Sequence, residues 1–149
     1  MNQPFDGLRV IDLSGLVGAY ASRLLAALGA EVIKIEPPGG SPLRRMAPFI
    51  EDGPERESSL WWAYLAMGTR SVVIDIEDHE HRNKLAALMQ TADIVVDDHG
   101  PDVLDGLGIG YEATRVANPG VIWIAITPFG ATGPKRSWAS SNLVAWAAS

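Results

Sequence analysis

Short apolar segments rich in Val and Ile recur along the chain, and most are separated by segments with helical spacing of apolar residues. The apolar segments predict five strands, at residues 8–13, 31–36, 71–76, 94–96 and 121–126. The intervening pattern predicts helices at residues 19–28, 60–67, 78–92 and 111–116. Nearly continuous apolar strands that alternate with helices indicate an α/β, Rossmann-like parallel sheet with helices on both faces.

Two of the predicted helices carry clear start or stop signals. In the first, Tyr20, Leu24 and Leu28 recur at i, i+4 and i+8 with Ala21 and Leu25 beside them, which predicts a buried face, and Gly29 is placed to cap the end. Asp78 is expected to cap the third helix. The buried face of that helix is expected to carry Leu85, Leu88, Met89 and Ala92.

A chain of 149 residues can bury one core, so we expect a single domain over residues 1–149. Residues 37–57 are rich in Pro, Gly and charge and are expected to form a long surface loop. The apolar run at residues 142–149 has no terminating signal. We therefore expect the chain to be truncated after Ser149.

Composition narrows the compartment and the partners. Cysteine is absent, the first residues lack the pattern of a secretory signal, and no apolar run approaches the ~20 residues that span a bilayer. These features favour a cytoplasmic protein with no membrane partner. The net charge is −6, and the close basic pairs are Arg44-Arg45 and Lys135-Arg136. Because nucleic acids are bound through clustered cations, the sequence disfavours them as partners.

The first strand, glycine loop, helix and second strand resemble a dinucleotide-binding unit, in which an acid such as Glu36 binds a ribose hydroxyl. The glycine spacing opposes this interpretation. With Gly15 first, the fingerprint requires glycine at positions occupied by Val17 and Tyr20. NAD or FAD binding is therefore a disfavoured alternative.

Acidic residues follow several predicted strands, at the edge where open α/β sheets bind ligands. They are Asp12, Glu36, Asp75, Asp97 and Asp98. Each could act as nucleophile or base, but we expect most of them to cap helices or accept hydrogen bonds from loops. His79 and His81 are expected to be solvated, while His99 is better placed for chemistry. No spacing is typical of a metal site, a phosphate-binding loop or a serine triad.

A series of collinear motifs covers essentially the whole chain. These motifs are residues 6–14 (DGLRVIDLS), 24–40 (LLAALGAEVIKIEPPGG), 70–75 (RSVVID), 92–96 (ADIVV), 100–104 (GPDVL), 107–111 (LGIGY), 118–122 (NPGVI) and 126–134 (ITPFGATGP). In order and spacing they resemble the amino-terminal part of the class III CoA-transferases, the family of the carnitine and formyl-CoA transferases. The resemblance implies an enzyme that moves CoA between carboxylic acids.

The resemblance also implies that the catalytic residue and the coenzyme-binding residues lie in different parts of the protein. An aspartate attacks the acyl-CoA thioester and passes through anhydride and aspartyl-CoA intermediates. In the family this aspartate lies beyond the segment that matches residues 143–149, so no catalytic residue is expected in this chain, and the chain alone is expected to be inactive. Coenzyme A or acyl-CoA is the implied ligand. The residues that match its binding surface are Val17, Gly18, Ile74, Asp75, Ile76, Glu77, Asp98, His99 and Gly100.

The chain departs from the family where phosphates would be bound. Basic residues of the family are replaced by Pro37, Glu77 and Gly106, and its usual asparagine after the fourth strand is Asp98. Loss of cations should weaken binding of the ADP phosphates. The cations that could compensate are Arg44, Arg45, Arg70, Lys135 and Arg136.

Two alternatives stay close to this family. The α-methylacyl-CoA racemases share the motifs but use a Gly-His-Asp triplet, which aligns with Ser140-Ser141-Asn142; Ser141 cannot replace the histidine base. A non-catalytic half of a tandem-domain protein is the other, and the altered phosphate contacts favour it. For the complete protein the resemblance implies a homodimer.

Overall fold

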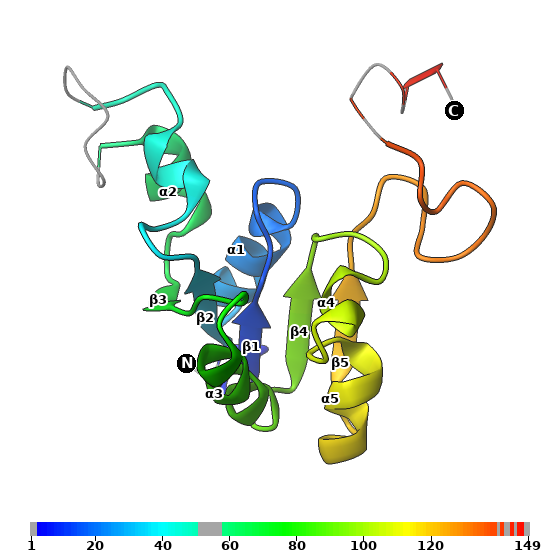
Figure 1. Ribbon diagram of the computed structural model, residues 1–149. Coiled ribbons are helices and arrows are strands. Elements are labelled where there is room, and N and C mark those ends of the chain that lie inside the picture. Colours follow the sequence, from blue (N-terminus) through cyan, green and yellow to red (C-terminus); the bar gives the residue numbers. More distant parts are fainter. Residues whose placement is uncertain (1–2, 51–57, 140, 142–143, 145, 148–149) are drawn as a thin grey trace.

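A five-stranded parallel sheet forms the centre of the molecule in the computed structural model, which describes residues 3–50, 58–139, 141, 144 and 146–147 (Figure 1). Its strands are β1 (Arg9–Asp12), β2 (Glu31–Glu36), β3 (Arg70–Val73), β4 (Ile94–Asp97) and β5 (Ile122–Ala125), in the order β3-β2-β1-β4-β5. The helices are α1 (Ala19–Ala27), α2 (Leu60–Leu65), α3 (His79–Met89), α4 (Val103–Gly106) and α5 (Tyr111–Ala117), with a 3₁₀ helix η1 (Pro42–Arg45). This arrangement confirms the predicted α/β fold.

Helices cover both faces of the central strands, as expected for a doubly covered parallel sheet. Alternate strand residues pack on opposite sides, so Val10 and Val32 belong to the core on the α1 side, while Ile11 and Val95 belong to the core on the α3 side. Figure 1 shows α1 behind the sheet and α3 and α5 in front of it. The outer strand β3 is exposed at all four residues, so coverage is complete only at the centre.

The buried face of α1 matches the predicted one only in part. Tyr20, Leu24 and Leu28 are exposed, whereas Leu25 packs with Ala26 against the core on the α1 side of the sheet. Ala19 and Ser22 are buried as well, and Ala19 packs in the cluster that includes Leu43 of η1 and Trp62 of α2. The predicted helix end is confirmed: Gly29 has φ of +103°, and its N–H and that of Ala30 return to carbonyls of the last turn.

The third strand is shorter than the apolar run that predicted it. It ends at Val73, because the backbone N–H of Asp75 turns to donate to His81 Nδ1 (3.1 Å) and the Asp75 carboxylate accepts from the Glu77 N–H (3.0 Å). The half-buried His81 is therefore engaged rather than solvated. Asp78 caps α3 as predicted, and the buried face of α3 carries Leu85 and Met89 with Ala92 just beyond it.

Two short helices have no counterpart in the sequence prediction. The 3₁₀ helix η1 lies in the predicted long loop, of which residues 51–57 fall outside the described part, and it buries Leu43 against Trp62 of α2. The other is α4, which follows β4 and buries Leu104. No helix within the described residues is long and apolar enough to cross a membrane.

Candidate functional site

The acids at the carboxyl ends of the strands all bind backbone N–H groups of loops; four of them bind the loop that follows their own strand, and Asp98 binds the loop after β1. Each of the five accepts at least one backbone N–H from a loop residue at 2.6 to 3.0 Å; they are Asp12, Glu36, Asp75, Asp97 and Asp98. The expectation that they accept loop hydrogen bonds is thus confirmed. These acids fix the shape of the carboxyl edge of the sheet, and none of them has a carboxylate that extends unbonded into solvent.

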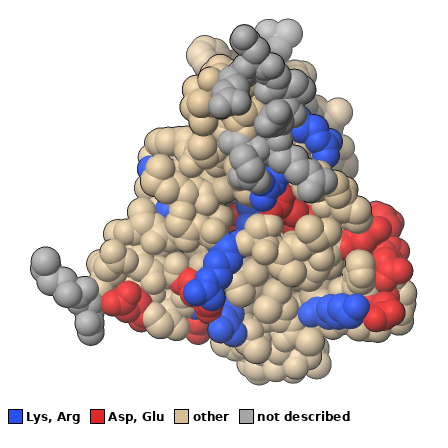
Figure 2. Space-filling view, turned by 90° about the vertical axis from the view of Figure 1, so that its left-hand side faces the viewer, with Lys and Arg blue, Asp and Glu red and all other residues tan. Residues whose placement is uncertain are grey.

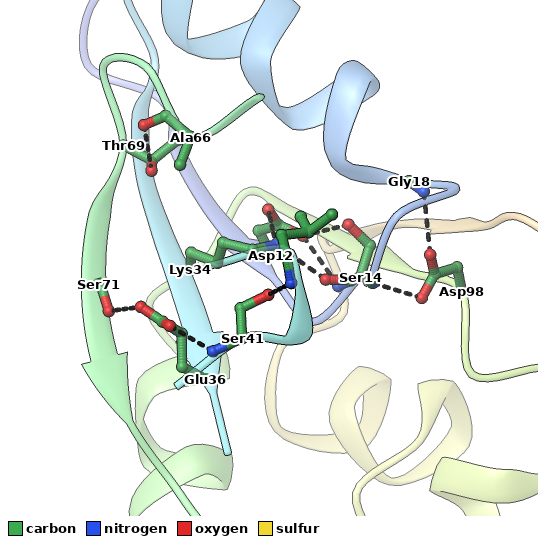
Figure 3. A network of polar contacts seen from close by, with 12 residues as sticks. Asp12, Ser14, Gly18, Lys34, Glu36, Ser41, Ala66, Thr69, Ser71 and Asp98 are labelled. Carbon is green, nitrogen blue, oxygen red and sulfur yellow. Dashed lines mark hydrogen bonds and ion pairs between the residues drawn. The ribbon is translucent and has the colours of Figure 1, made fainter. Parts of the chain in front are cut away.

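A buried ion pair lies below the β1–α1 loop (Figure 3). Lys34 and Asp12 are aligned in register on β2 and β1, are 2% and 1% exposed, and join Nζ to Oδ2 at 2.9 Å. Lys34 Nζ also donates to the Ser14 carbonyl (2.8 Å), while Asp12 Oδ1 accepts from the Ser14 N–H (2.9 Å) and hydroxyl (2.6 Å). The pair therefore fixes the first residue of the loop by its N–H, hydroxyl and carbonyl.

Glu36, at the end of β2, is saturated by its neighbours. Its two oxygens accept from Arg44 Nε (2.7 Å) and Nη2 (2.8 Å), from the Ser41 N–H (2.6 Å) and from the Ser71 hydroxyl. Burial raises the pKa of Glu36, but the hydrogen bonds of Arg44, Ser71 and Ser41 and the charge of Arg44 outweigh it and bring the pKa to about 2. With every acceptor position used, Glu36 is not available to a ribose hydroxyl, which adds to the case against a dinucleotide site.

Asp98 joins the loop after β4 to the loop after β1. Its Oδ1 accepts the Gly15 N–H at 2.6 Å and its Oδ2 accepts the Gly18 N–H at 3.0 Å, as Figure 3 shows for Gly18. Next to it, the hydrogen bond that His99 Nδ1 shares with Asp97 (2.9 Å) raises the pKa of His99, and burial opposes this only in part. The two loops form one continuous surface.

Gly18 is required by the way the β1–α1 loop folds back on itself. A Cβ at Gly18 would lie 2.4 Å from Ser14 Cβ and 2.7 Å from its Oγ. We expect Gly18→Ala to shift the loop and to lower the free energy of unfolding by about 1–3 kcal/mol in urea denaturation. The matched control is Gly106→Ala in α4, where no atom lies within 4 Å of the added Cβ. An equal effect of both substitutions would contradict the close packing of the loop.

The loop after β3 is tied to α3. Arg82 Nη1 donates to the carbonyls of Ile76 and Glu77, both at 2.8 Å, and Arg82 forms no ion pair with an acid in the described part of the chain. Glu77 is exposed, whereas Ile74 is buried in the core on the α3 side. A cation that the sequence analysis overlooked therefore lies beside the position where the family has lysine.

A hollow of about 490 Å³ opens between the ends of β4 and β5 and the helices α4 and α5. Tyr111 and Trp123, packed edge to face with ring centroids 6.2 Å apart, contribute its aromatic wall. Its other lining residues include Gly100, Thr127 and Thr132, together with the acids Asp97, Asp102, Asp105 and Glu112. The hollow suits a flat ring and hydroxyl groups better than a phosphate.

The structure places the predicted coenzyme-binding residues in two groups. Val17, 71% exposed, and the buried Gly18 lie beside the loop of residues 98–100, and Gly100 extends that surface into the hollow. Residues 74–77 follow β3, which is separated from β1 by β2, so roughly 10 Å of sheet lies between the two groups. A ligand that touches both groups must extend across the sheet edge.

The cations proposed as compensation are mostly engaged elsewhere. Arg44 binds Glu36 and lies 3.7 Å from the centroid of the Trp62 ring. Arg70 begins β3 and pairs with Glu31 at the opposite edge of the sheet. Arg136 pairs with Asp102 at the hollow. On the face shown in Figure 2 the largest group of acidic side chains lies at the right, and the Lys and Arg side chains elsewhere on this face are interspersed with further acids.

The sequence did not lead us to predict that Lys34 is buried or that it forms an ion pair with Asp12. A lysine within an otherwise apolar strand is a usable signal, because a buried ammonium group requires a carboxylate. Asp12 stands at the corresponding end of the neighbouring strand. Arg82 gave no such signal, since a charged residue in the first turns of an exposed helix is ordinary.

The geometry defines an α/β domain with a parallel sheet. In this domain the loop after β1 and the loop after β4 are hydrogen-bonded to each other at the carboxyl edge of the sheet. Residues 5–149 match the sequence profile of CoA-transferase family III. The chain belongs to this family, as the motifs of the sequence indicated.

Characterised relatives carry CoA-transferase names. The chain is 38% identical over 143 residues to the succinyl-CoA:(R)-benzylsuccinate CoA-transferase subunit BbsE of Thauera aromatica, covering 96% of this chain and 35% of that protein. It is 39% identical over 146 residues to the succinate–glutarate CoA-transferase of Agrobacterium fabrum, covering 95% of this chain and 36% of the relative. The chain thus spans about a third of the length of the curated relatives it matches.

Crystal structures of family members show the same fold. A CaiB/BaiF family protein from Brucella suis superposes with a TM-score of 0.87 at 34% identity, covering 96% of this chain and 38% of that one. The Rv3272 protein of Mycobacterium tuberculosis gives a TM-score of 0.83 at 32% identity, covering 95% and 38%. The parallel sheet and its helices are therefore those of the family.

Proposed function

We propose that this chain supplies the coenzyme-binding edge of a class III CoA-transferase that moves CoA between two carboxylic acids. The observation that carries the proposal is the bridge from Asp98 to Gly15 and Gly18, which unites two of the loops that match the family's CoA surface. Family membership over residues 5–149 supports it. The proposed ligand is CoA or an acyl-CoA, bound across the carboxyl ends of β1 and β4.

The proposed chemistry uses an aspartate outside these residues. Its carboxylate attacks the thioester carbonyl, the C–S bond breaks, and the CoA thiolate then attacks the aspartyl carbonyl of the anhydride, releasing the first acid and leaving an aspartyl-CoA thioester. The second acid reverses the sequence. In support, the acids at the sheet edge all accept loop hydrogen bonds, Asp12 and Glu36 being ion-paired as well. The part played by this chain is to hold the thiolate-bearing coenzyme in place between the steps.

The hollow beside β5 borders the proposed surface, because Gly100, which lines the hollow, directly follows the Asp98 bridge. Its aromatic wall and carboxylates such as Asp97 and Asp105 can contact an uncharged part of the ligand that carries hydroxyl groups. Such a part can reach the hollow from the β1–α1 loop without leaving the protein surface.

Assembly into a homodimer in the cytoplasm completes the proposal. Large apolar side chains remain exposed on α1 and α2, among them Tyr20, Leu24, Trp61 and Tyr64. Surfaces of this kind mark contacts with further polypeptide.

In the racemase alternative a histidine is needed at Ser141, whose hydroxyl here accepts the Val144 N–H at 3.3 Å.

A non-catalytic module of a tandem-domain protein is the second candidate. It is favoured by the carboxylates that stand where the family binds phosphates, above all the exposed Glu77. In this case the fold would serve contacts between domains and would not bind the coenzyme.

Calorimetric titration separates these candidates. The proposed function predicts that the chain binds CoA saturably and binds NADH at least about tenfold more weakly, because Glu36 is closed to ribose. The isolated chain is expected to show no transfer of CoA from succinyl-CoA to a second acid. Absence of CoA binding would favour the non-catalytic module, and tighter binding of NADH would overturn the proposal.

A further inference from the structure

The amino end of α1 is the position where open α/β sheets usually receive a ligand phosphate, because its free N–H groups and the helix dipole attract anions. In this chain α1 has nine residues and begins after Gly18, with no side-chain cap and no acid in its first turn. The Gly18 carbonyl accepts the Ala21 N–H (3.0 Å), and no side chain of the helix caps its amino end.

A carboxylate from a distant part of the chain binds the N-cap residue Gly18 and the loop that leads into the helix. Asp98 lies 80 residues beyond Gly18 and accepts the Gly15 N–H with one oxygen (2.6 Å) and the Gly18 N–H with the other (3.0 Å). This approach does not depend on glycine at position 15, since a Cβ there would stand at an ordinary contact distance of 3.6 Å from Oδ1 of Asp98. The arrangement imitates two oxygens of a bound phosphate.

The surrounding structure holds this arrangement in place. Ser14, which precedes the bridge, is fixed by the buried pair of Asp12 and Lys34, and Gly18 packs directly on Ser14. A phosphate at the amino end of α1 would have to break two hydrogen bonds to a carboxylate or lie beside that negative charge. Both alternatives oppose binding.

We propose that Asp98 is an internal anion that closes the amino end of α1 to ligand phosphates, so that the β1–α1 loop accepts an uncharged part of its ligand. This inference rests on the proposed function only in naming the ligand: for CoA the uncharged part is the pantetheine arm, with its neutral amides. The phosphates then lie away from the amino end of α1. Asp98 is thus a specificity-determining residue for which part of a nucleotide ligand meets this loop.

The test uses inorganic pyrophosphate and the amide NMR signals of Gly15 and Gly18. In the native chain we expect no saturable shift of these two signals at millimolar pyrophosphate. In Asp98→Ser, which frees both N–H groups, we expect both signals to shift saturably and pyrophosphate to bind about tenfold or more tightly than to the native chain. Glu80→Ser, which removes an exposed carboxylate on α3 that pairs with Lys84, controls for net charge and should behave like the native chain.

Asp98→Asn provides a second variant of the same size, in case the serine variant does not fold. Its side chain has one acceptor oxygen where Asp98 has two, so one of the two N–H groups loses its partner, and a smaller gain in the same direction is expected. Native signals that already titrate with pyrophosphate, or a folded variant that gains no affinity, would overturn the inference. A native chain that fails to bind CoA would count against the proposed function and would leave the pyrophosphate comparison intact.

Discussion

Replacement of Lys34 by methionine is expected to lower the free energy of unfolding by about 3–5 kcal/mol, because it leaves the carboxylate of Asp12 buried without its counter-charge. A loss of this size is a large fraction of the ~5–15 kcal/mol that stabilises an ordinary domain. Asp12→Asn should be similarly damaging, since it leaves the ammonium group of Lys34 unpaired. Urea denaturation followed by circular dichroism measures both.

The double variant Lys34→Met/Asp12→Asn distinguishes pairing from packing. With both charges removed, no ion is left buried, and we expect the double variant to be more stable than either single variant. Lys84→Met is the matched control, because Lys84 pairs with Glu80 on the exposed side of α3 and should contribute little. Strictly additive losses in the double variant would show that the two side chains act independently.

Glu36 is expected to make the largest pH-dependent contribution to stability at the sheet edge. The pKa of Glu36 is lowered from 4.5 to about 2 in the folded chain, so its contribution is complete above about pH 4.5 and is lost as the pH falls toward 2. A shift of this size corresponds to an upper bound of about 3 kcal/mol. Glu36→Gln should remove the contribution and leave Arg44 without its partner.

Denaturation of the native chain and of Glu36→Gln at several pH values separates the contribution of Glu36 to stability from that of the other carboxylates. The difference in unfolding free energy should be largest at neutral pH and should narrow as the pH falls below about 4.5. Glu31→Gln is the control, since Glu31 also binds two arginines, Arg9 and Arg70, but lies on the more exposed amino side of β2. A difference for Glu36→Gln that does not change with pH would contradict the low pKa.

Strands and their order of appearance could be predicted because buried parallel strands leave a continuous apolar signature. The runs around Val10, Val32 and Val95 are buried on both faces, so side-chain chemistry alone marked them. The end of β3 could not be predicted in the same way. There the run continues to Ile76, and the strand ends early because a loop N–H binds His81 across the turn, a contact that spacing does not encode.

The face of α1 shows a second limit. Tyr20, Leu24 and Leu28 follow a helical repeat but stay exposed, and the sheet is covered by the neighbouring side of the helix with Leu25 and Ala26. The short helices α4 and η1 were missed because four residues carry too little periodicity. Helix ends were more predictable, as Gly29 and Asp78 show, because a helix cap depends on residues within a few positions of the helix end.

At the candidate site, the position of the acids along the strands predicted which of them lie at the carboxyl edge of the sheet. It did not predict which backbone N–H groups each acid binds. The link between Asp98 and the β1–α1 loop joins residues 80 positions apart, and only the pairing of β1 with β4 brings them together. The motif resemblance predicted ligand contacts in these two loops, and the fold explains why the loops lie side by side.

The central claim is that CoA lies across the carboxyl ends of β1 and β4, and mapping of amide NMR shifts during a CoA titration tests it most directly. The account predicts saturable shifts at Val17, Gly18 and residues 98–100, with smaller changes at Trp123 and other residues of the hollow. Shifts confined to the opposite edge, near Glu31 and Arg70, or no shifts at saturating CoA, would contradict it.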